Sequence, residues 1–163
     1  MFSIREIVDM AIQLEKNAET FYREALARVS TPTLEPVLVC LADEEREHAE
    51  WFERLKRVLE EAKTGGEGGE ISGAALRGLV GDQKFSLADV DLSKIESAEE
   101  LIELAVEHEK DTILFYQMLQ SFIESPKTTK ELDEIIAQED QHIKMLQECE
   151  IGVVKGEEVS GEQ

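Results

Sequence analysis

Apolar residues recur at steps of three and four along four stretches of the chain, the spacing that places side chains on one face of an α-helix. The stretches cover residues 3 to about 29, 33 to about 63, 97 to about 124, and about 128 to 150. Pro32 separates the first two stretches and Pro126 the last two, and a proline inside such a pattern ends a helix. The pattern therefore predicts an all-α chain made of two helical hairpins.

Two of these helices carry the signature of a capped N-terminus. Ser3 precedes Glu6 by three residues, and Ser97 precedes Glu100 by three residues, which is the spacing of a capping box. Thr33 is a candidate cap for the second helix. These signals place the starts of three of the four helices.

Residues 64–96 join the two hairpins and contain seven of the ten glycines. Such a length is unusual for a connection in a compact domain, so we expect a long crossover or lid, with a short helix over residues 74–80. Residues 153–163 are acidic and contain few apolar side chains, which predicts a disordered tail. The expected architecture is one domain over residues 1–152, a four-helix bundle of two antiparallel hairpins joined by this crossover.

Polar residues interrupt each of the four apolar faces near its centre. A glutamate lies on every face, and on the second and fourth faces a histidine follows it by three residues. The six residues are Glu15, Glu45, His48, Glu109, Glu139 and His142. An ionised carboxylate is costly to bury unless a cation or a metal ion neutralises it, so these positions need an explanation.

The two hairpins repeat each other at a constant spacing of 94 residues, and the repeat separates core from surface acids. The matching pairs are Glu15 with Glu109, Tyr22 with Tyr116, Pro32 with Pro126, Glu45 with Glu139, and His48 with His142. Other acids have no acidic counterpart and are interpreted as surface charges. These are Glu19, Glu44, Glu47 and Glu107, which stand opposite Ile113, Gln138, Gln141 and Gln13.

One glutamate from each of two helices and a Glu-x-x-His from each of the other two form the ligand arrangement of di-iron and di-manganese carboxylate bundles. Carboxylates can bridge two ions, and each imidazole can bind one. Two divalent ions would balance the four glutamates without any basic residue on these faces. The sequence therefore predicts a di-metal site, and it leaves iron, manganese and zinc open.

Several polar neighbours of these six residues have more than one interpretation. Tyr22 and Tyr116 lie two turns beyond the first glutamate of each hairpin, where they could bond to ligand carboxylates, lie on an electron path, or simply pack in the core. Thr112 could bond to a ligand or to its own helix backbone. His108 lies beside the core row and is either a supporting residue or a partly exposed one.

Composition narrows the classes of function. The formal charge of −20 leaves no basic stripe for nucleic acid and disfavours anionic membranes. No apolar run reaches membrane-spanning length, and the charged N-terminal stretch is not a signal peptide, so we expect a cytoplasmic protein. Two distant cysteines exclude a disulfide scaffold and a cysteine-only metal site.

With these residues in place, the chain resembles the ferritin-like superfamily, specifically the di-iron domain of the rubrerythrin family. The resemblance covers residues 3 to about 150, including the long connection. It implies a ferritin-like four-helix bundle in which the six residues above bind two iron ions, with Glu45 and Glu139 as the bridges. It also implies chemistry with oxygen or hydrogen peroxide, which two ferrous ions reduce before a reductant resets the site.

The chain departs from the family pattern in two ways. Rubrerythrins usually carry a rubredoxin module with paired Cys-x-x-Cys motifs, and the sequence has none, so electrons would come from an external donor such as a rubredoxin-like protein. The family also has an additional glutamate in the third helix, at the position that Thr112 occupies here. The remaining six-ligand set is closer to that of bacterioferritin.

Three functions agree with these residues. The first is a di-iron oxidoreductase that acts on peroxide or oxygen, the second is a ferroxidase or iron-handling protein, and the third is a non-catalytic metal-binding bundle. Because bundles of this kind often pair, we also expect a homodimer.

Overall fold

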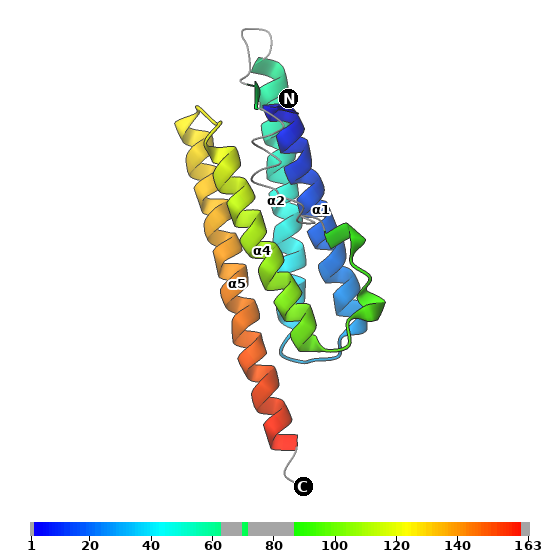
Figure 1. The fold of residues 1–163 in the computed structure, drawn as a ribbon. Coiled ribbons are helices and arrows are strands. Elements are labelled where there is room, and N and C mark those ends of the chain that lie inside the picture. Colours follow the sequence, from blue (N-terminus) through cyan, green and yellow to red (C-terminus); the bar gives the residue numbers. More distant parts are fainter. Residues whose placement is uncertain (1, 63–69, 72–86, 161–163) are drawn as a thin grey trace.

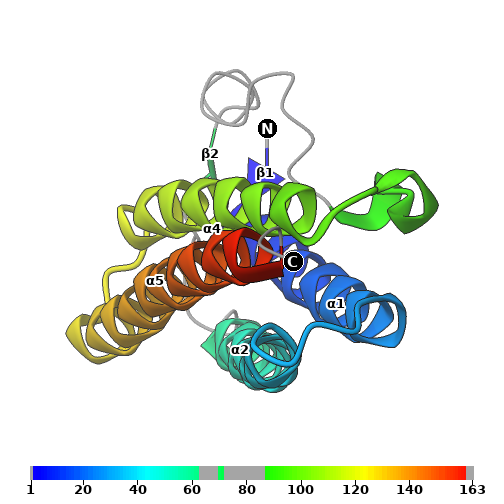
Figure 2. The same ribbon diagram turned by 90° about the horizontal axis from the view of Figure 1, so that it is seen from below.

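Four long helices make up most of the chain. The computed structural model describes residues 2–62, 70–71 and 87–160. The helices are α1 (Ile4–Arg28), α2 (Glu35–Ala62), α4 (Ala98–Gln120) and α5 (Pro126–Ser160). They pack as two antiparallel hairpins side by side, α1 with α2 and α4 with α5 (Figure 1). The end-on view shows them arranged around a common interior (Figure 2), which confirms the predicted four-helix bundle.

The caps follow the sequence signals at α1 and α4. Ser3 and Glu6 form a complete capping box, in which the Ser3 amide donates to the Glu6 carboxylate over 2.7 Å. The Ser97 hydroxyl accepts from the Glu100 amide over 3.1 Å. These bonds satisfy amides that have no partner within the helix.

The start of α2 differs from the prediction that Thr33 caps it. The helix begins at Glu35, after a turn over residues 32–34. The amides of Leu34 and Glu35 both donate to the carbonyl oxygen of Thr31 over 3.0 Å. A backbone turn therefore satisfies the amides that a threonine side chain was expected to bind.

The second hairpin turns earlier than expected, because α4 ends at Gln120 and α5 begins at Pro126. Pro126 is the first residue of its helix, where its missing N–H costs no hydrogen bond and its fixed φ favours the helix. The proline thus starts a helix as well as ending the preceding pattern.

The end of α5 also differs from the expectation of a tail after Gly152. The helix continues to Ser160 and projects past the other helices (Figure 1). A Cβ built on Gly152 would meet nothing within 4 Å, so no close approach requires glycine there. Helical hydrogen bonds are local, and a single glycine weakens a helix by only about 1 kcal/mol without ending it.

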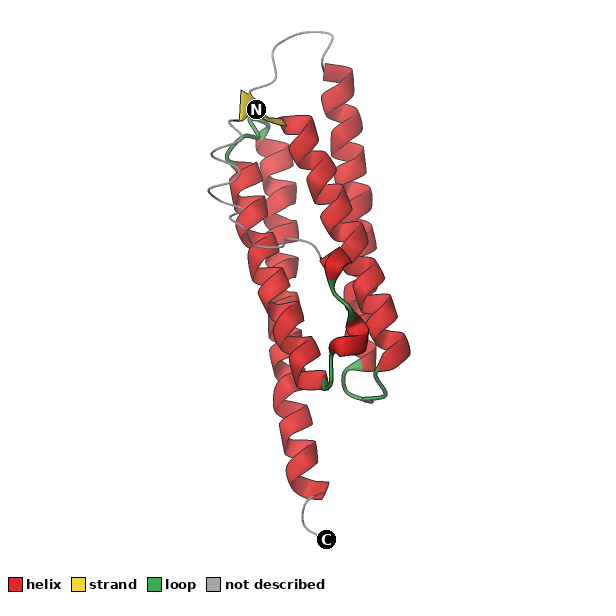
Figure 3. Cartoon of the chain, turned by 45° about the vertical axis from the view of Figure 1, so that its right-hand side comes forward, coloured by secondary structure: helices red, strands yellow, loops and turns green. Residues whose placement is uncertain are grey.

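The described part of the connection contains only short elements. Strands β1 (Phe2–Ser3) and β2 (Glu70–Ile71) form an antiparallel pair at one end of the bundle (Figure 3), and two 3₁₀ turns, η1 (Leu87–Asp89) and η2 (Leu92–Lys94), precede α4. The short helix predicted over residues 74–80 lies outside the described residues. No described helix has the length and apolarity to cross a membrane.

The buried apolar side chains form two clusters at different levels of the bundle. One includes Leu38 and Leu41 of α2 with Ile102 of α4, and the other includes Val8 of α1 with Leu119 of α4. Along each helix, the six polar residues of the predicted metal site fall between the two clusters. The site is therefore closed at both ends by packed hydrocarbon.

Candidate metal centre

The structure brings all six predicted ligands together in the interior of the bundle. Each helix contributes at least one, and none is more than 4% exposed. The members are Glu15 of α1, Glu45 and His48 of α2, Glu109 of α4, and Glu139 and His142 of α5. The helical periodicity of the sequence was sufficient to find this set.

These side chains divide into two overlapping groups that could each hold one metal ion. Glu15 and His48 belong to one group, and Glu109 and His142 belong to the other. Glu45 and Glu139 belong to both. Within each group the ligand atoms lie within 4.8 Å of one another, so two ions could share the two common carboxylates.

The two shared carboxylates each face both histidines, with one oxygen toward each ring. Nδ1 of His48 lies 2.9 Å from Oε1 of Glu139 and 3.3 Å from Oε2 of Glu45. Nδ1 of His142 lies 2.9 Å from Oε2 of Glu139 and 3.4 Å from Oε1 of Glu45. This division of oxygens is what a bridging carboxylate requires.

The remaining carboxylates each approach one histidine only. Oε1 of Glu15 lies 3.7 Å from Nδ1 of His48, and Oε1 of Glu109 lies 3.7 Å from Nδ1 of His142. The two imidazole rings are stacked, with centroids 5.9 Å apart. Glu15 and Glu109 are therefore terminal members of the two groups.

Electrostatics separates the terminal carboxylates from the shared ones. Burial, and then the charges of Glu45 and Glu139, raise the pKa of Glu15 and of Glu109 well above the usual value. Burial acts the same way on Glu45 and Glu139, but their contacts with the two histidines outweigh it and lower both pKa values. The shared carboxylates are thus charged and the terminal ones favour the proton in the metal-free protein.

The histidines complement the shared carboxylates. Burial alone would lower the pKa of His48, but the charge of Glu139 and the contacts with Glu139 and Glu45 raise it to about 12. Burial would also lower the pKa of His142, but its contacts with Glu109, Glu139, Glu44 and Glu45 outweigh burial and raise that pKa. Both imidazoles therefore hold a proton that a metal ion would have to displace.

Five buried atoms of this cluster have no hydrogen bond of acceptable geometry among the described residues. They are Oε1 of Glu45, Oε2 of Glu109, both carboxylate oxygens of Glu139, and Nδ1 of His142. Unsatisfied buried polar atoms are rare in folded proteins, and each costs on the order of 1 to 3 kcal/mol. Oxygen and imidazole donors suit a divalent transition metal, so the residues present fit a di-metal centre.

The two predicted tyrosines bond to the terminal carboxylates of the opposite hairpin. The Tyr22 hydroxyl of α1 donates to Oε1 of Glu109, and the Tyr116 hydroxyl of α4 donates to Oε1 of Glu15. Burial, followed by the adjacent carboxylate, raises the pKa of each phenol, so both remain donors. Of the three interpretations from sequence, the structure shows hydrogen bonding to the candidate ligands.

Glu44 and Gln138 are functional candidates that sequence reasoning missed. Glu44 Oε2 accepts from Nε2 of His142 over 2.5 Å, and Gln138 Oε1 lies 2.9 Å from Nε2 of His48. The repeat correctly excludes Glu44 from the ligand groups, but its interpretation as a mere surface charge is wrong. The available signal was position, because both residues directly precede the glutamate of a Glu-x-x-His.

His108 is buried, which differs from the expectation of a partly exposed residue. It is 8% exposed, and burial lowers its pKa. Its Nε2 lies 3.5 Å from Oγ1 of Thr112, so the threonine faces this histidine in place of the two partners considered from sequence. Neither residue belongs to a metal-ligand group of the described residues.

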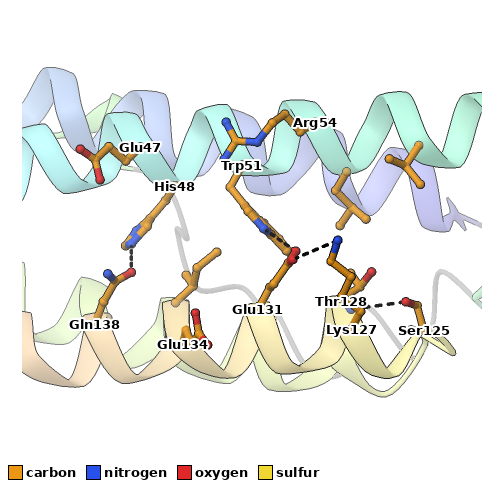
Figure 4. A pocket seen from close by; sticks show the side chains of 13 residues that line it. Glu47, His48, Trp51, Arg54, Ser125, Lys127, Thr128, Glu131, Glu134 and Gln138 are labelled. Atoms are coloured by element: carbon orange, nitrogen blue, oxygen red, sulfur yellow. Dashed lines mark hydrogen bonds and ion pairs between the residues drawn. The ribbon is translucent and has the colours of Figure 1, made fainter.

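A groove of about 640 Å³ runs between α2 and α5 and reaches the edge of the centre. His48 and Gln138 line one part of it, and Trp51 reaches across it to donate to Glu131 over 3.1 Å (Figure 4). Lys127 lines the groove beyond this bond (Figure 4). Solvent can therefore approach the outer side of His48, although the ring itself is buried.

Comparison with protein families adds an independent finding. The family model described as rubrerythrin matches residues 6–150, which is most of the chain. The chain belongs to the rubrerythrin family. The match spans all six candidate ligands and the long connection between the hairpins.

Two solved structures share this rubrerythrin-family fold. A protein from Thermotoga maritima, described as a ferritin-like diiron-carboxylate protein, is 25% identical with a TM-score of 0.67, and the alignment covers 91% of this chain and 95% of that one. A hypothetical protein from Pyrococcus furiosus is 20% identical with a TM-score of 0.69, covering 94% and 92%. None of the curated proteins compared with the sequence matches it.

Proposed function

We propose that this protein binds two iron ions and reduces hydrogen peroxide or oxygen with electrons from an external donor. The observation that carries the proposal is the geometry of Glu45 and Glu139, whose oxygens are divided between two histidines. A single structural ion would need only one of the two ligand groups. Membership of the rubrerythrin family and the diiron-carboxylate description of the Thermotoga maritima protein support iron as the metal.

The residues around the site would have distinct tasks. Glu45 and Glu139 would bridge the ions, Glu15 and His48 would complete one position, and Glu109 and His142 would complete the other. Two ferrous ions bound there would supply the two electrons that convert hydrogen peroxide and two protons into two water molecules. The apolar clusters at both ends limit water around the centre.

Tyr22 and Tyr116 would hold the terminal carboxylates in orientation. Each phenol donates one hydrogen bond to Oε1 of the terminal glutamate of the other hairpin, and the second oxygen of Glu109 has no hydrogen bond among the described residues. Because burial keeps both phenols protonated, they continue to donate throughout the physiological pH range.

The electron donor would be a separate protein, such as one of the rubredoxin type. Cys40 and Cys149 are both free thiols on different helices, and the sequence has no Cys-x-x-Cys pair. The chain therefore has no second redox site of the cysteine type.

The test is anaerobic loading of the metal-free protein with two equivalents of ferrous iron, followed by rapid mixing with hydrogen peroxide. We expect iron oxidation much faster than that of free ferrous iron, with one peroxide consumed for each pair of ions. Oxidation no faster than in the protein-free control would overturn the proposal. Glu139→Gln is the matched variant, because it replaces one oxygen of a carboxylate that both positions share while nearly preserving side-chain size.

Ferroxidase activity is the second candidate. It is favoured by Thr112, which presents a hydroxyl to His108 where the family pattern has an additional carboxylate. Excess ferrous iron with oxygen distinguishes the two functions. Repeated turnover that deposits ferric iron favours the ferroxidase, whereas a single turnover that then requires a reductant favours the peroxidase or oxidase.

A further inference from the structure

The outer nitrogens of the two candidate histidine ligands bind chemically different groups. Nε2 of His142 donates to the carboxylate of Glu44, whereas Nε2 of His48 faces the amide oxygen of Gln138. Both contacts cross between α2 and α5, and Glu44 and Gln138 are equivalent positions of the 94-residue repeat. The six candidate ligands are of the same residue types in the two hairpins. The two histidines therefore differ in their outer partners, Glu44 and Gln138.

A carboxylate and an amide constrain an imidazole differently. Ionised Glu44 can only accept, so it keeps a proton on Nε2 of His142 and leaves Nδ1 for a metal ion. The amide of Gln138 has both a donor and an acceptor, so after a rotation it can also donate to a bare Nε2 of His48. Glu44 therefore restricts His142 to the form that binds metal through the inner nitrogen, whereas Gln138 permits either form of His48.

The negative charge of the Glu44 carboxylate also favours metal binding at His142. A carboxylate hydrogen-bonded to the far side of an imidazole increases the basicity of the ring and stabilises the positive charge that it gains on binding a metal. An amide offers only a dipole. Replacing such an outer partner typically changes metal affinity by about 10- to 100-fold. Because the Glu44 side chain is 35% exposed, solvent screens it and we take the lower end of that range.

Solvent access adds a second difference between the two positions. Of these four residues, only His48 and Gln138 line the groove between α2 and α5 (Figure 4). Water there competes for the hydrogen bond of Gln138 and screens charges near His48. The contact between Glu44 and His142 lies outside the lining of that groove.

We propose that Glu44 and Gln138 make the two metal positions unequal, so that the position at His142 fills before the position at His48. Glu44 acts as a positioning residue that promotes metal binding by His142, and Gln138 is its weaker counterpart. This inference rests on the proposed di-metal function.

The test is a zinc titration of the metal-free protein, followed by NMR of the histidine rings. The chain has only three histidines, and His108 serves as an internal reference. We expect the His142 ring signals to change during the first equivalent and those of His48 during the second, with affinities that differ by about tenfold or more. Glu44→Gln should weaken the first step by about tenfold, and Gln138→Glu should strengthen the second by a similar factor.

Exchange of the two residues gives the sharpest result. In the double variant Glu44→Gln with Gln138→Glu, the net charge of the protein is unchanged and His48 should bind zinc first. Glu47→Gln and Gln141→Glu are the matched controls, because these exposed residues are also equivalent in the repeat, and the described hydrogen bonds of the two imidazole rings go to Glu45, Gln138 and Glu44. In the controls, His142 should still bind zinc before His48, and the two zinc affinities should still differ by about tenfold.

The outcomes separate the inference from the function on which it rests. Failure of the wild-type protein to bind two zinc ions would overturn the di-metal proposal itself. Binding of two ions with both rings changing together, or in an order that neither single variant nor the exchange alters, would overturn the inference alone. Far-UV circular dichroism checks folding, and the single variants decide the question if the exchanged protein does not fold.

Discussion

The two hairpins of this protein are nearly identical where they face the centre and different one layer further out. At the inner layer, α1 and α2 supply Glu15, Glu45 and His48, and the second hairpin supplies the same residue types at the same spacing. At the outer layer, the second hairpin has a glutamine where the first has Glu44. The repeat thus preserves the atoms that would touch metal and changes the atoms that tune them.

A second difference lies on α1 and α4. Leu14 and Ala18 of α1 correspond to His108 and Thr112 of α4, so one helix has two apolar groups where the other has a buried polar pair. A symmetric set of ligands therefore need not give two equivalent metal positions.

Removal of a shared carboxylate should abolish both positions at once. In Glu139→Ala, each ligand group loses one of its two shared carboxylates and keeps only that of Glu45, and we expect zinc binding to fall from two ions to none that are tightly held. Metal at one hundred times its dissociation constant stabilises a protein by about 2.7 kcal/mol, so the wild type should gain thermal stability with zinc and the variant should not. Asp140→Asn is the control, because this exposed neighbour belongs to neither group. Retention of two ions by Glu139→Ala would contradict the bridging role.

Removal of a terminal carboxylate should affect one position only. Glu15→Gln and Glu109→Gln should each reduce the stoichiometry from two ions to one, measured by cobalt absorbance and calorimetry. If the positions are unequal, Glu15→Gln keeps the tighter ion beside His142, and Glu109→Gln keeps the weaker one beside His48. Equal affinities in the two variants would show that the hairpins are equivalent.

Metal affinity should rise with pH between 6 and 8. The carboxylates raise the pKa of His48 to about 12 and raise that of His142 as well, so both rings are protonated in the metal-free protein across this range. Each proton displaced by metal adds about a tenfold gain in affinity per pH unit. Calorimetry in buffers with different ionisation enthalpies counts these protons. An affinity independent of pH would show that the rings are already neutral.

The stability of the metal-free protein should fall with rising pH, which is opposite to the change in metal affinity. A histidine whose pKa is raised on folding contributes stability that is fully present below its unfolded pKa and is lost as the pH rises through the folded value. The metal-free protein should therefore have the full contribution of His48 below about pH 6.5 and lose it progressively as the pH rises from there toward 12. Thermal unfolding of the metal-free protein at increasing pH measures this loss.

Loss of a tyrosine hydroxyl should have a smaller and crossed effect. Tyr22→Phe removes the hydrogen bond to Glu109 and should weaken the position at His142, whereas Tyr116→Phe acts through Glu15 on the position at His48. A hydrogen bond of this kind contributes about 1 kcal/mol, or roughly a fivefold change in affinity. The stepwise zinc binding constants of the two variants test whether each tyrosine affects the position of the opposite hairpin. Equal effects on both steps would indicate a general loss of packing.

The smallest effect is expected at the polar pair of α4. Replacing His108 by Leu and Thr112 by Ala gives α4 the apolar pair of α1. Because both partners are removed together, the free energy of unfolding should change by less than about 1 kcal/mol, and two zinc ions should still bind. Chemical denaturation and the zinc stoichiometry measure the outcome. Loss of a metal position would place His108 in the centre.

The sequence alone determined the four helices, the six inward polar residues and their correspondence between hairpins. Helical periodicity fixes which side chains share a face, and a buried Glu-x-x-His repeated at one spacing is improbable as packing. The capping boxes at Ser3 and Ser97 are local as well, and the sequence predicted the Ser3–Glu6 box in full. All of these features depend on residues near one another in the chain.

Contacts between different helices could not be predicted from the sequence. The contact between Glu44 and His142, the crossed tyrosine bonds and the burial of His108 depend on the rotation and axial offset of packed helices, and periodicity does not encode either quantity. The 94-residue repeat identified Glu44 and Gln138 as a mismatched pair but could not show that each reaches the histidine of the other hairpin. The mismatch makes the centre asymmetric because the packing of α2 against α5 places each of these two residues at the histidine of the other helix.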